Sequence, residues 1–334
     1  MKISVLGDGA WGTALAMVLV GNGHDVTIWG AFPDYLAQMD KERENSRFLK
    51  GIRLPDQLNF NSDMAAAAEA NWLLIATPTQ YLRSVLEVLK PSFDPKRHAI
   101  INVAKGIENN SLLTISEMCR EILGECRYCA LSGPSHAEEV SRQVPTAVVA
   151  ASDDAALAES VRDLFINDTF RVYTSDDPVG VELGGALKNI MAVAAGIIDG
   201  MKLGDNPKAA LLTRGIAEMS RLGAALGGKP ATFAGLSGIG DLIVTCTSGH
   251  SRNRYVGEQI GLGRKLPEIQ AEMGMVCAEG VKTAVSARAL SRKCGIEAPL
   301  VEAVYATLYE NKPPAEAVRE LMTRKAKSED DFSA

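Results

Sequence analysis

The sequence lacks an excess of basic residues and any apolar run long enough to cross a bilayer. It has 35 Lys and Arg against 41 Asp and Glu, a net charge of −6. General nucleic-acid affinity depends on excess positive charge, so this balance argues against it. The same balance still allows a local cationic pocket for a small anion. A bilayer-spanning helix needs roughly 20 apolar residues, and runs such as Asn71–Ala76 are far shorter. Met1-Lys2 leads directly into a β-type run and leaves no room for a secretory leader. We therefore expect a cytoplasmic protein without a membrane span.

The sequence also lacks the paired cysteine or histidine spacing of a metal centre. Cys126 and Cys129 have a suitable two-residue spacing, but no second pair accompanies them. A zinc site needs about four ligands. Cys129 stands in an apolar stretch, where a free cysteine behaves as a small hydrophobic residue. We expect no bound metal and, in a reducing compartment, no disulfide.

The first half of the chain alternates short β-type runs with helical segments. The length of 334 residues suggests about two domains. Strands alternating with helices predict βαβ units and a mostly parallel sheet, as in an α/β Rossmann-type domain. The expected strands are Lys2–Leu6, Val26–Trp29, Trp72–Ala76, Ala99–Val103 and Tyr128–Leu131, with Thr146–Ala151 and Phe170–Thr174 as possible extensions, and Ala10–Asn22 is an expected helix.

The strand signal fades after about Asp177, and long segments rich in Ala, Leu, Met and Glu follow. Such segments predict an all-α domain. We therefore expect a Rossmann-like domain over residues 1–184 and an all-α domain over residues 185–334. The expected helices are Glu182–Asp199, Pro207–Leu226, Ala278–Cys294, Leu300–Tyr309 and Ala315–Met322.

A glycine-rich segment, Gly7-Asp8-Gly9-Ala10-Trp11-Gly12, lies between the first strand and the first helix. It has the GxGxxG spacing of a dinucleotide-binding loop: the first glycine permits the tight turn, the second lets backbone N–H groups approach the pyrophosphate, and the third permits close helix–sheet packing. The helix N-terminus adds unsatisfied donors and partial positive charge. The alternatives are a glycine turn in a domain that binds nothing, or a flavin in place of nicotinamide.

The acidic residue that usually ends the second strand and accepts the ribose 2′-OH is missing. The strand ends Trp29-Gly30-Ala31-Phe32, with neither an acid nor a basic clamp. Asp34 lies a little further on, and three arginines, Arg43, Arg47 and Arg53, are more distant. The choice between NAD and NADP is therefore open at this point.

Two lysines stand in unusual surroundings. Lys188 lies within an apolar helical segment, and Lys105 follows a predicted strand at the sheet edge where open α/β folds bind ligands. A lysine in a dry site has a lowered pKa, which suits proton transfer at neutral pH. For Lys188 taken alone, a paired or snorkelling structural lysine is an equally good interpretation.

A polar cluster near residue 250 offers a second set of candidates. Ser251 is placed to cap a helix that carries Arg252 and Asn253 in its first turn, and such an N-terminus with an arginine suits a phosphate. The alternative is a capped polar loop with Arg252 and Arg254 in solvent. His250 alone is not a convincing base.

Taken together, these segments resemble the NAD(P)-dependent glycerol-3-phosphate dehydrogenase family. The matching blocks run in the family's order from residue 7 to about residue 280, a highly specific combination. They are Ala104–Glu108, Ser132–Ala137, Gly185–Asn189 with Ala192, Gly196, Asp199-Gly200, Leu203-Gly204 and Asn206, Gly235–Leu242, Thr245 with Ser251–Arg254, and Glu279-Gly280.

The resemblance implies hydride transfer between sn-glycerol 3-phosphate and dihydroxyacetone phosphate with NAD or NADP, supplying glycerol 3-phosphate for phospholipid synthesis. It implies that Lys188 exchanges the proton of the substrate C2 oxygen, that Lys105 polarises that oxygen, and that Asp241 orients Lys188. The implied substrate-binding residues are Lys105, Gly133, Ser135, Lys188, Asp241, Ser251, Arg252 and Asn253. The implied cofactor-binding residues are Gly7, Gly9, Ala10, Trp11, Gly12, Lys105, Ala137, Arg252, Cys277 and Glu279.

The chain departs from the family pattern at two places. Members often carry Arg or His just after the second strand, where this chain has Ala31-Phe32, and Cys277 stands where many have an aliphatic residue. The resemblance also implies a homodimer. The rival hypotheses are another phosphosugar or hydroxyacid dehydrogenase of the same architecture, and a nucleotide-sensing regulator without catalysis. The Asp241 and Ser251–Arg254 segments argue against the first, and the presence of both lysines argues against the second.

Overall fold

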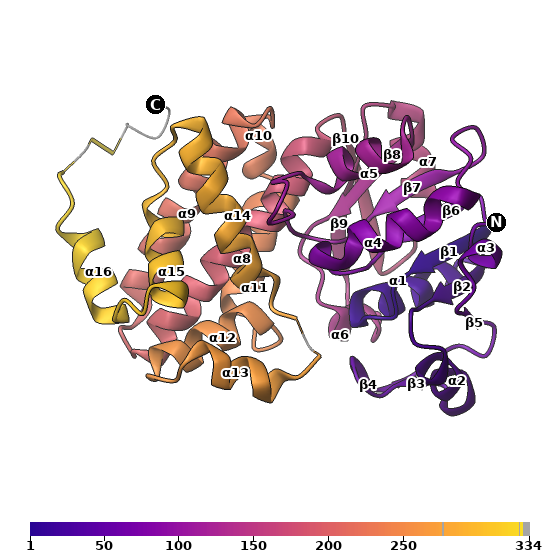
Figure 1. Ribbon diagram of the computed structural model, residues 1–334, viewed down its shortest axis with the longest axis horizontal. Coiled ribbons are helices and arrows are strands. Elements are labelled where there is room, and N and C mark those ends of the chain that lie inside the picture. Colours follow the sequence, from indigo (N-terminus) through magenta and orange to yellow (C-terminus); the bar gives the residue numbers. More distant parts are fainter. Residues whose placement is uncertain (276, 327, 330–334) are drawn as a thin grey trace. The chain divides into compact units, whose positions relative to one another are not determined.

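The computed structural model describes residues 1–275, 277–326 and 328–329, and these residues form two compact units (Figure 1). Unit 1 contains residues 1–104 and 115–178, and unit 2 contains residues 105–114 and 179–334. The chain thus changes unit between residues 178 and 179, whereas the sequence placed the domain boundary after residue 184. The short segment 105–114, which follows a strand of unit 1, packs with unit 2.

Unit 1 is built on an eight-stranded sheet in the order β10-β9-β8-β7-β6-β1-β2-β5. Every neighbouring pair is parallel except β8 with β9. The strands are β1 (Lys2–Leu6), β2 (Asp25–Trp29), β5 (Asn59–Asn61), β6 (Trp72–Ile75), β7 (Ala99–Asn102), β8 (Arg127–Ser132), β9 (Thr146–Ala151) and β10 (Phe170–Ser175). A separate antiparallel pair consists of β3 (Glu44–Asn45) and β4 (Leu49–Arg53). The predicted mostly parallel sheet is confirmed, including both of its possible extensions.

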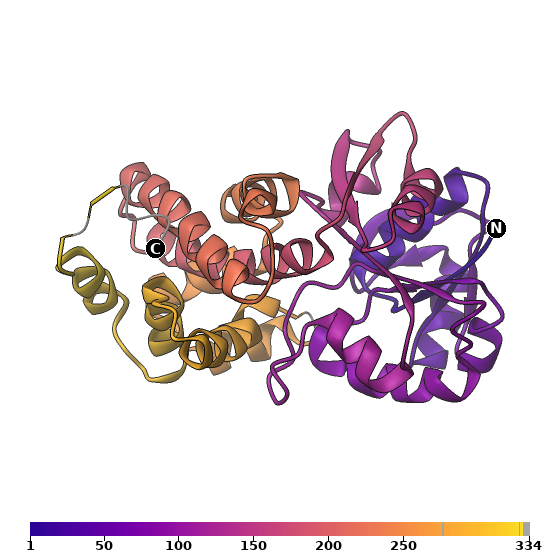
Figure 2. The same cartoon turned by 90° about the horizontal axis from the view of Figure 1, so that it is seen from above.

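Helices lie on both sides of this sheet, as expected for a Rossmann-type unit (Figure 2). One group packs together as α3 (Met64–Ala67), α4 (Thr79–Leu89) and α5 (Ile115–Leu123); the other as α1 (Ala10–Gly21), α6 (Ala137–Val140) and α7 (Ala155–Phe165). Helix α2 (Pro33–Glu42) packs against β3 and β5. Because both faces are covered, the central strands are mostly apolar, and β6 and β7 are buried at every residue. Cys129 lies in this core, as the sequence predicted.

Helices and the loops between them make up the described residues of unit 2, and no strand lies among these residues, which confirms the all-α expectation. Its helices are α8 (Pro178–Gly200), α9 (Asp205–Ala225), α10 (Pro230–Phe233), α11 (Asp241–Thr247), α12 (Arg252–Gly261), α13 (Leu266–Met273), α14 (Glu279–Cys294), α15 (Pro299–Tyr309) and α16 (Pro314–Met322). A single π-helical turn over Leu236–Gly240 leads directly into α11. This turn and the start of α11 position Asp241.

Helix α8 forms the centre of unit 2, and most of the hydrophobic core of the unit surrounds it. By length and composition α8 could cross a membrane, but 94% of its most apolar window is buried inside the protein. It is therefore the core helix of a folded unit. A Cβ on Gly196 would stand 1.9 Å from the carbonyl oxygen of Arg254, and one on Gly257 would stand 1.9 Å from that of Val193. Only glycine permits this close backbone contact between α8 and α12, which draws the start of α12 toward Lys188.

Candidate active site

The glycine loop lies at the point where the strand order of unit 1 reverses. Strand β1 pairs with β2 on one side and with β6 on the other, and the chain crosses from one side to the other between them. Gly7 has φ +134°, and a Cβ there would stand 2.8 Å from the backbone carbon of Ala76, just after β6. A Cβ on Gly12 would stand 2.7 Å from the carbonyl oxygen of Gly7. Both glycines are therefore required by packing, at the edge where open α/β sheets bind nucleotides.

The second glycine of the loop differs from the other two. A Cβ on Gly9 would meet nothing within 4 Å, so this glycine faces open space. No side chain caps the N-terminus of α1, and the indole N–H of Trp11 is buried without an acceptor among the described residues. Open space over uncapped N–H donors fits a pyrophosphate group at the start of the helix. The loop thus fits a dinucleotide, with Ala10 and Trp11 on its first turn.

Three further predicted site residues, Gly133, Ser135 and Ala137, follow β8. Since β1, β6, β7 and β8 are parallel, their carboxyl ends share one edge of the sheet. The Ser135 hydroxyl donates to the carbonyl oxygen of Gly133 at 2.9 Å. Ala137 begins α6, which packs against α1. The structure therefore brings these residues to the same sheet edge as the glycine loop.

In unit 2, two lysines share one buried carboxylate. Lys188 of α8 donates to Asp241 Oδ1 at 2.8 Å, and Lys105 donates to Asp241 Oδ2 at 2.7 Å. Lys188 also contacts the Thr245 hydroxyl at 2.6 Å, which in turn donates to the Asp241 backbone carbonyl at 2.6 Å. The exposed fractions of the side chains are 7% for Lys188, 15% for Lys105 and 2% for Asp241, so water screens the cluster little.

With all three groups ionised, the lysine–aspartate cluster carries one net positive charge. Burial lowers the pKa of Lys188 to about 8; Asp241 opposes this shift, and Lys105 adds to it. Burial alone would raise the pKa of Asp241, but the two ammonium groups outweigh burial and hold it below its usual value. These shifts suit Lys188 to proton exchange near neutral pH while Asp241 stays ionised.

The start of α12 has the capped geometry that the sequence predicted. Ser251 is the N-cap, and its hydroxyl accepts from the Arg254 backbone N–H at 3.2 Å. Arg254 pairs with Asp199 at 2.7 Å, so it does not lie free in solvent. The Arg252 side chain, by contrast, has no hydrogen bond or ion pair within the part of the chain that the structure describes. Of the two arginines, Arg252 is the one available to an anion.

A chain of amide hydrogen bonds ties this helix to the lysine–aspartate cluster. Asn253 donates to Asn189 Oδ1 at 2.9 Å and accepts from the Gly280 backbone N–H at 2.9 Å. Asn189, next to Lys188, donates to the carbonyl oxygen of Lys105 at 3.3 Å. Asn253 thus joins α8, α12 and α14.

The remaining predicted cofactor residues lie near the start of α14. Burial raises the pKa of Cys277 to about 11; Glu279 raises it further and Arg252 lowers it. These three residues are therefore electrostatic neighbours. All predicted site residues of unit 2 gather around the starts of α11, α12 and α14, together with Lys188 and Lys105.

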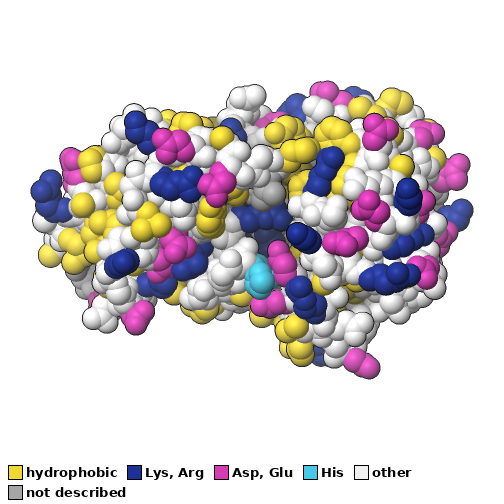
Figure 3. Space-filling model, turned by 90° about the horizontal axis from the view of Figure 1, so that it is seen from below, with side chains coloured by type: hydrophobic (Ala, Val, Ile, Leu, Met, Phe, Trp, Pro, Cys, Tyr) yellow, Lys and Arg dark blue, Asp and Glu magenta, His cyan; other side chains and the backbone are white. Residues whose placement is uncertain are grey.

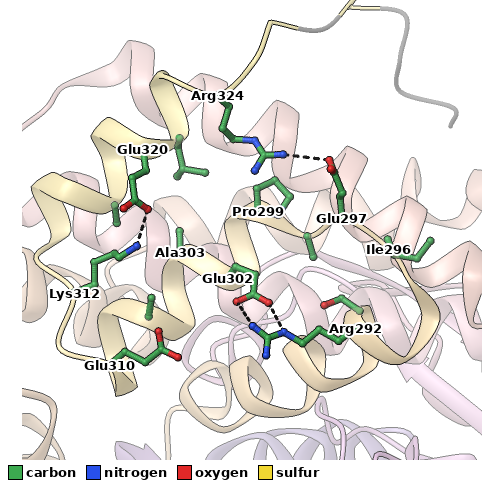
Figure 4. Close-up of a pocket in the computed structure, with 15 residues that line it drawn as sticks. Arg292, Ile296, Glu297, Pro299, Glu302, Ala303, Glu310, Lys312, Glu320 and Arg324 are labelled. Carbon is green, nitrogen blue, oxygen red and sulfur yellow. Dashed lines mark hydrogen bonds and ion pairs between the residues drawn. The ribbon is translucent and has the colours of Figure 1, made fainter.

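On the face shown in Figure 3, acidic and basic side chains are mixed. A hollow of about 370 Å³ among α14, α15 and α16 contains Arg292, Lys312 and Arg324, which pair with Glu302, Glu320 and Glu297 (Figure 4). Because its cations are neutralised, this hollow lacks the character of an anion site. Within the described ranges no group of three or more His, Cys, Asp or Glu is placed to hold a metal ion.

Thr245 and Asn189, which had no separate predicted role, both contact the lysine–aspartate cluster. Thr245 lies one helical turn after Asp241, and Asn189 directly follows Lys188. The four-residue spacing was a usable signal for Thr245. Asn189 had no comparable signal, because its partners lie 84 and 64 residues away.

An α/β unit with an open glycine loop, together with an all-α unit that carries two lysines on one carboxylate and an arginine at a helix N-terminus, has the features of a nicotinamide-dependent dehydrogenase of a small anionic substrate. Family models described as the N-terminus and the C-terminus of NAD-dependent glycerol-3-phosphate dehydrogenase match residues 2–158 and 177–319. The chain belongs to this family.

Similar proteins agree with this. Glycerol-3-phosphate dehydrogenase [NAD(P)+] of Citrifermentans bemidjiense is 52% identical over 98% of both chains. The enzyme of the same name from Chlorobium limicola is 50% identical over 98% of this chain and 99% of its own. The crystal structure of glycerol-3-phosphate dehydrogenase from Coxiella burnetii superposes with a TM-score of 0.93 at 40% identity, covering 97% of this chain and 99% of the other.

Proposed function

We propose that this protein interconverts sn-glycerol 3-phosphate and dihydroxyacetone phosphate with NAD or NADP. The observation that carries the proposal is the carboxylate of Asp241 shared by Lys188 and Lys105. This cluster combines a proton that moves near neutral pH with a net positive charge that suits a developing alkoxide. Family membership and the open glycine loop support the same activity.

Lys188 is the proton-exchanging group in this proposal. When bound, the nicotinamide nucleotide supplies or accepts a hydride. Lys188 donates a proton to the C2 oxygen as the ketone becomes an alcohol, and takes it back in the reverse direction. A pKa of about 8 leaves the amine mostly protonated at pH 7 yet easily deprotonated. Thr245, which contacts the amine, fixes its direction.

Asp241 and Lys105 set the charge and the orientation of this group. Asp241 accepts hydrogen bonds from both amines and so holds them in place. Its negative charge offsets the repulsion between the two buried ammonium groups. Lys105 polarises the substrate oxygen and stabilises negative charge on it. The Asn189 side chain donates to the Lys105 carbonyl and so ties the backbone of Lys105 to α8.

Arg252 is the proposed partner of the substrate phosphate. Its side chain stands in the first turn of α12, beyond the Ser251 cap, and has no ion-pair partner among the described residues. An arginine at a helix N-terminus binds phosphate through charge and directed N–H donors. The Asn253 side chain is used in holding α12, α8 and α14 together. Its contribution to the substrate is therefore mainly to position Arg252 and Ser251.

Nucleotide binding is assigned to Gly7, Gly9, Gly12 and the first turn of α1, with Ala137 nearby. Lys105, Arg252, Cys277 and Glu279 supply further cofactor contacts in the proposal. In this proposal unit 1, residues 1–104 and 115–178, binds the nucleotide, and unit 2, residues 105–114 and 179–334, carries out catalysis. A cytoplasmic location, a homodimer and a role in supplying phospholipid synthesis belong to the proposal and rest on the family resemblance.

The deciding experiment is a turnover assay of the purified, folded protein with dihydroxyacetone phosphate, run in parallel with NADH and NADPH. We expect oxidation of at least one coenzyme, and loss of that activity in Lys188→Met with coenzyme affinity retained. A folded protein that leaves this ketone unchanged with both coenzymes would refute the proposal. Reduction of other ketoacids instead would favour a related dehydrogenase, and coenzyme binding without any turnover would favour a regulator.

A further inference from the structure

The carboxyl group of Asp8 occupies the end of β2, where the sequence supplies no acid of its own. A Cβ built on Gly30, the residue after β2, would stand 3.1 Å from Asp8 Oδ2. This oxygen is buried and has no hydrogen-bond partner among the described residues, while Asp8 as a whole is partly exposed. The carboxyl group therefore has unused hydrogen-bonding capacity, and because Asp8 is only partly buried, a donor from outside the chain can approach it.

The backbone of Asp8 is held firmly in this position. Asn45 of β3 donates to the Asp8 carbonyl and to the Thr13 hydroxyl, both at 2.8 Å. Asn45 in turn accepts from the Tyr35 hydroxyl at 2.7 Å. Helix α2, β3 and β4 lie together beside the end of β2 in Figure 1. Asp8 is therefore a fixed feature of the glycine loop, supported by residues from α1, α2 and β3.

The three arginines that follow β2 along the chain, Arg43, Arg47 and Arg53, have different contacts. Arg43 donates to the carbonyl oxygens of Leu58 and Asp56 at 2.8 and 3.0 Å, and Arg53 pairs with Asp56 at 3.1 Å. Arg47 stacks on the Tyr35 ring, with its guanidinium carbon 4.0 Å from the ring centroid. Burial raises the pKa of Asp8, and Arg47 acts against this shift. Of these three arginines, Arg47 is the one that acts on Asp8.

We infer that Asp8 is a coenzyme-specificity residue that favours NAD over NADP. Its carboxylate takes the place of the missing acid after β2, accepting a hydrogen bond from an adenosine ribose hydroxyl and repelling a 2′-phosphate. Ala31 and Phe32, which follow Gly30, bring no cation to that phosphate. Arg47 moderates the discrimination without reversing it. This inference rests on the proposed function, since it assumes that the glycine loop binds a nicotinamide nucleotide.

The test is equilibrium titration of the protein with NADH and with NADPH, followed by calorimetry rather than by activity. We expect the unmodified protein to bind NADH at least about tenfold more tightly, a difference of about 1.4 kcal/mol. In Asp8→Asn this ratio should shrink at least about tenfold, chiefly because NADPH binds more tightly. Asp34→Asn, which removes the exposed acid in the first turn of α2, is the matched control and should leave the ratio unchanged.

Asp8→Ser provides a second variant if Asp8→Asn does not fold. Titration of the unmodified protein with AMP and with adenosine 2′,5′-bisphosphate measures the same discrimination without any substitution. Equal affinity for NADH and NADPH, an unchanged ratio in the Asp8 variants, or a shift caused by Asp34→Asn in place of Asp8→Asn would each overturn the inference. A protein that binds neither coenzyme would instead contradict the proposed function.

Discussion

Removing the charge of Lys188 and removing the charge of Asp241 should have very different effects on the stability of the protein. With all groups ionised the cluster carries one net positive charge. Lys188→Met leaves the balanced pair of Lys105 and Asp241, whereas Asp241→Asn leaves two buried ammonium groups without a carboxylate. Both variants should lose activity, so the free energy of unfolding separates them.

The expected difference follows from the geometry. At N–O distances of 2.7 and 2.8 Å, each ammonium–carboxylate contact supplies about 6 kcal/mol of attraction at an effective dielectric of about 20. In Asp241→Asn both attractions are lost, and loss of a proton from Lys188 then relieves part of the repulsion between the two amines. Breaking a buried pair typically destabilises a protein by about 3–5 kcal/mol. For a unit of this size, that lowers Tm by roughly 6–20 °C. Lys188→Met, which keeps the side-chain volume and the balanced pair, should change stability by less than about 1.5 kcal/mol.

The assay is thermal unfolding of both variants, followed between pH 7 and 10. The pKa of Lys188 is lower in the folded state, about 8 against 10.5. Between these values the unfolded state binds more protons, so this group makes stability rise with pH. In Asp241→Asn the loss of the carboxylate lowers that pKa further, so the rise should begin at lower pH; in Lys188→Met it should be absent. Equal destabilisation of the two variants, or no recovery of Asp241→Asn at alkaline pH, would refute the shared-carboxylate interpretation.

Three other predictions concern the glycine loop, the phosphate site and a buried acid. Gly9→Val should fold normally yet lose NADH binding in calorimetric titration, because the new side chain points into the open space beside the loop. Gly12→Val should instead destabilise unit 1 in thermal unfolding, because its Cβ meets Gly7 and Ala76. Normal NADH affinity in folded Gly9→Val would argue against the loop as the binding site. Arg252→Ala should raise KM for dihydroxyacetone phosphate at least about tenfold in steady-state kinetics, because a charged hydrogen bond is lost. Arg254→Ala should lose stability as well, because it breaks the pair with Asp199. An unchanged KM in Arg252→Ala would remove Arg252 from the phosphate site. Burial raises the pKa of Glu218 to about 7 from 4.5, so the folded state binds more protons than the unfolded state between these values. The free energy of unfolding should therefore fall by up to about 3 kcal/mol as pH rises from 4.5 to 7. Glu218→Gln should lack this pH dependence in denaturant unfolding, and identical stability–pH profiles of the two proteins would contradict the prediction.

Local patterns in the sequence were enough to predict the type of most long elements. Strand β1 and the helix after the glycine loop were predicted to within one residue, because alternating β-branched runs and glycine spacing are short-range signals. Ser251 was likewise recognised as a cap, since capping depends on residues within one helical turn. Short elements such as β3, β4 and α10 were not predicted, because two to five residues carry too little periodicity.

Residue patterns therefore predicted the two-part fold class and the glycine loop, and the family resemblance supplied the set of candidate residues. Which of those residues meet became clear from the packing of the folded chain. Lys105 and Asp241 are 136 residues apart, and Lys188 and Asp241 are 53 apart; nothing local indicates that both amines share one carboxylate. The structure also shows that Arg254, unlike Arg252, is engaged in an ion pair with Asp199, and that the Asp8 carboxyl group lies at the end of β2. These outcomes depend on how helices and strands distant in the chain pack against one another, and such packing is set by the whole core rather than by any short segment.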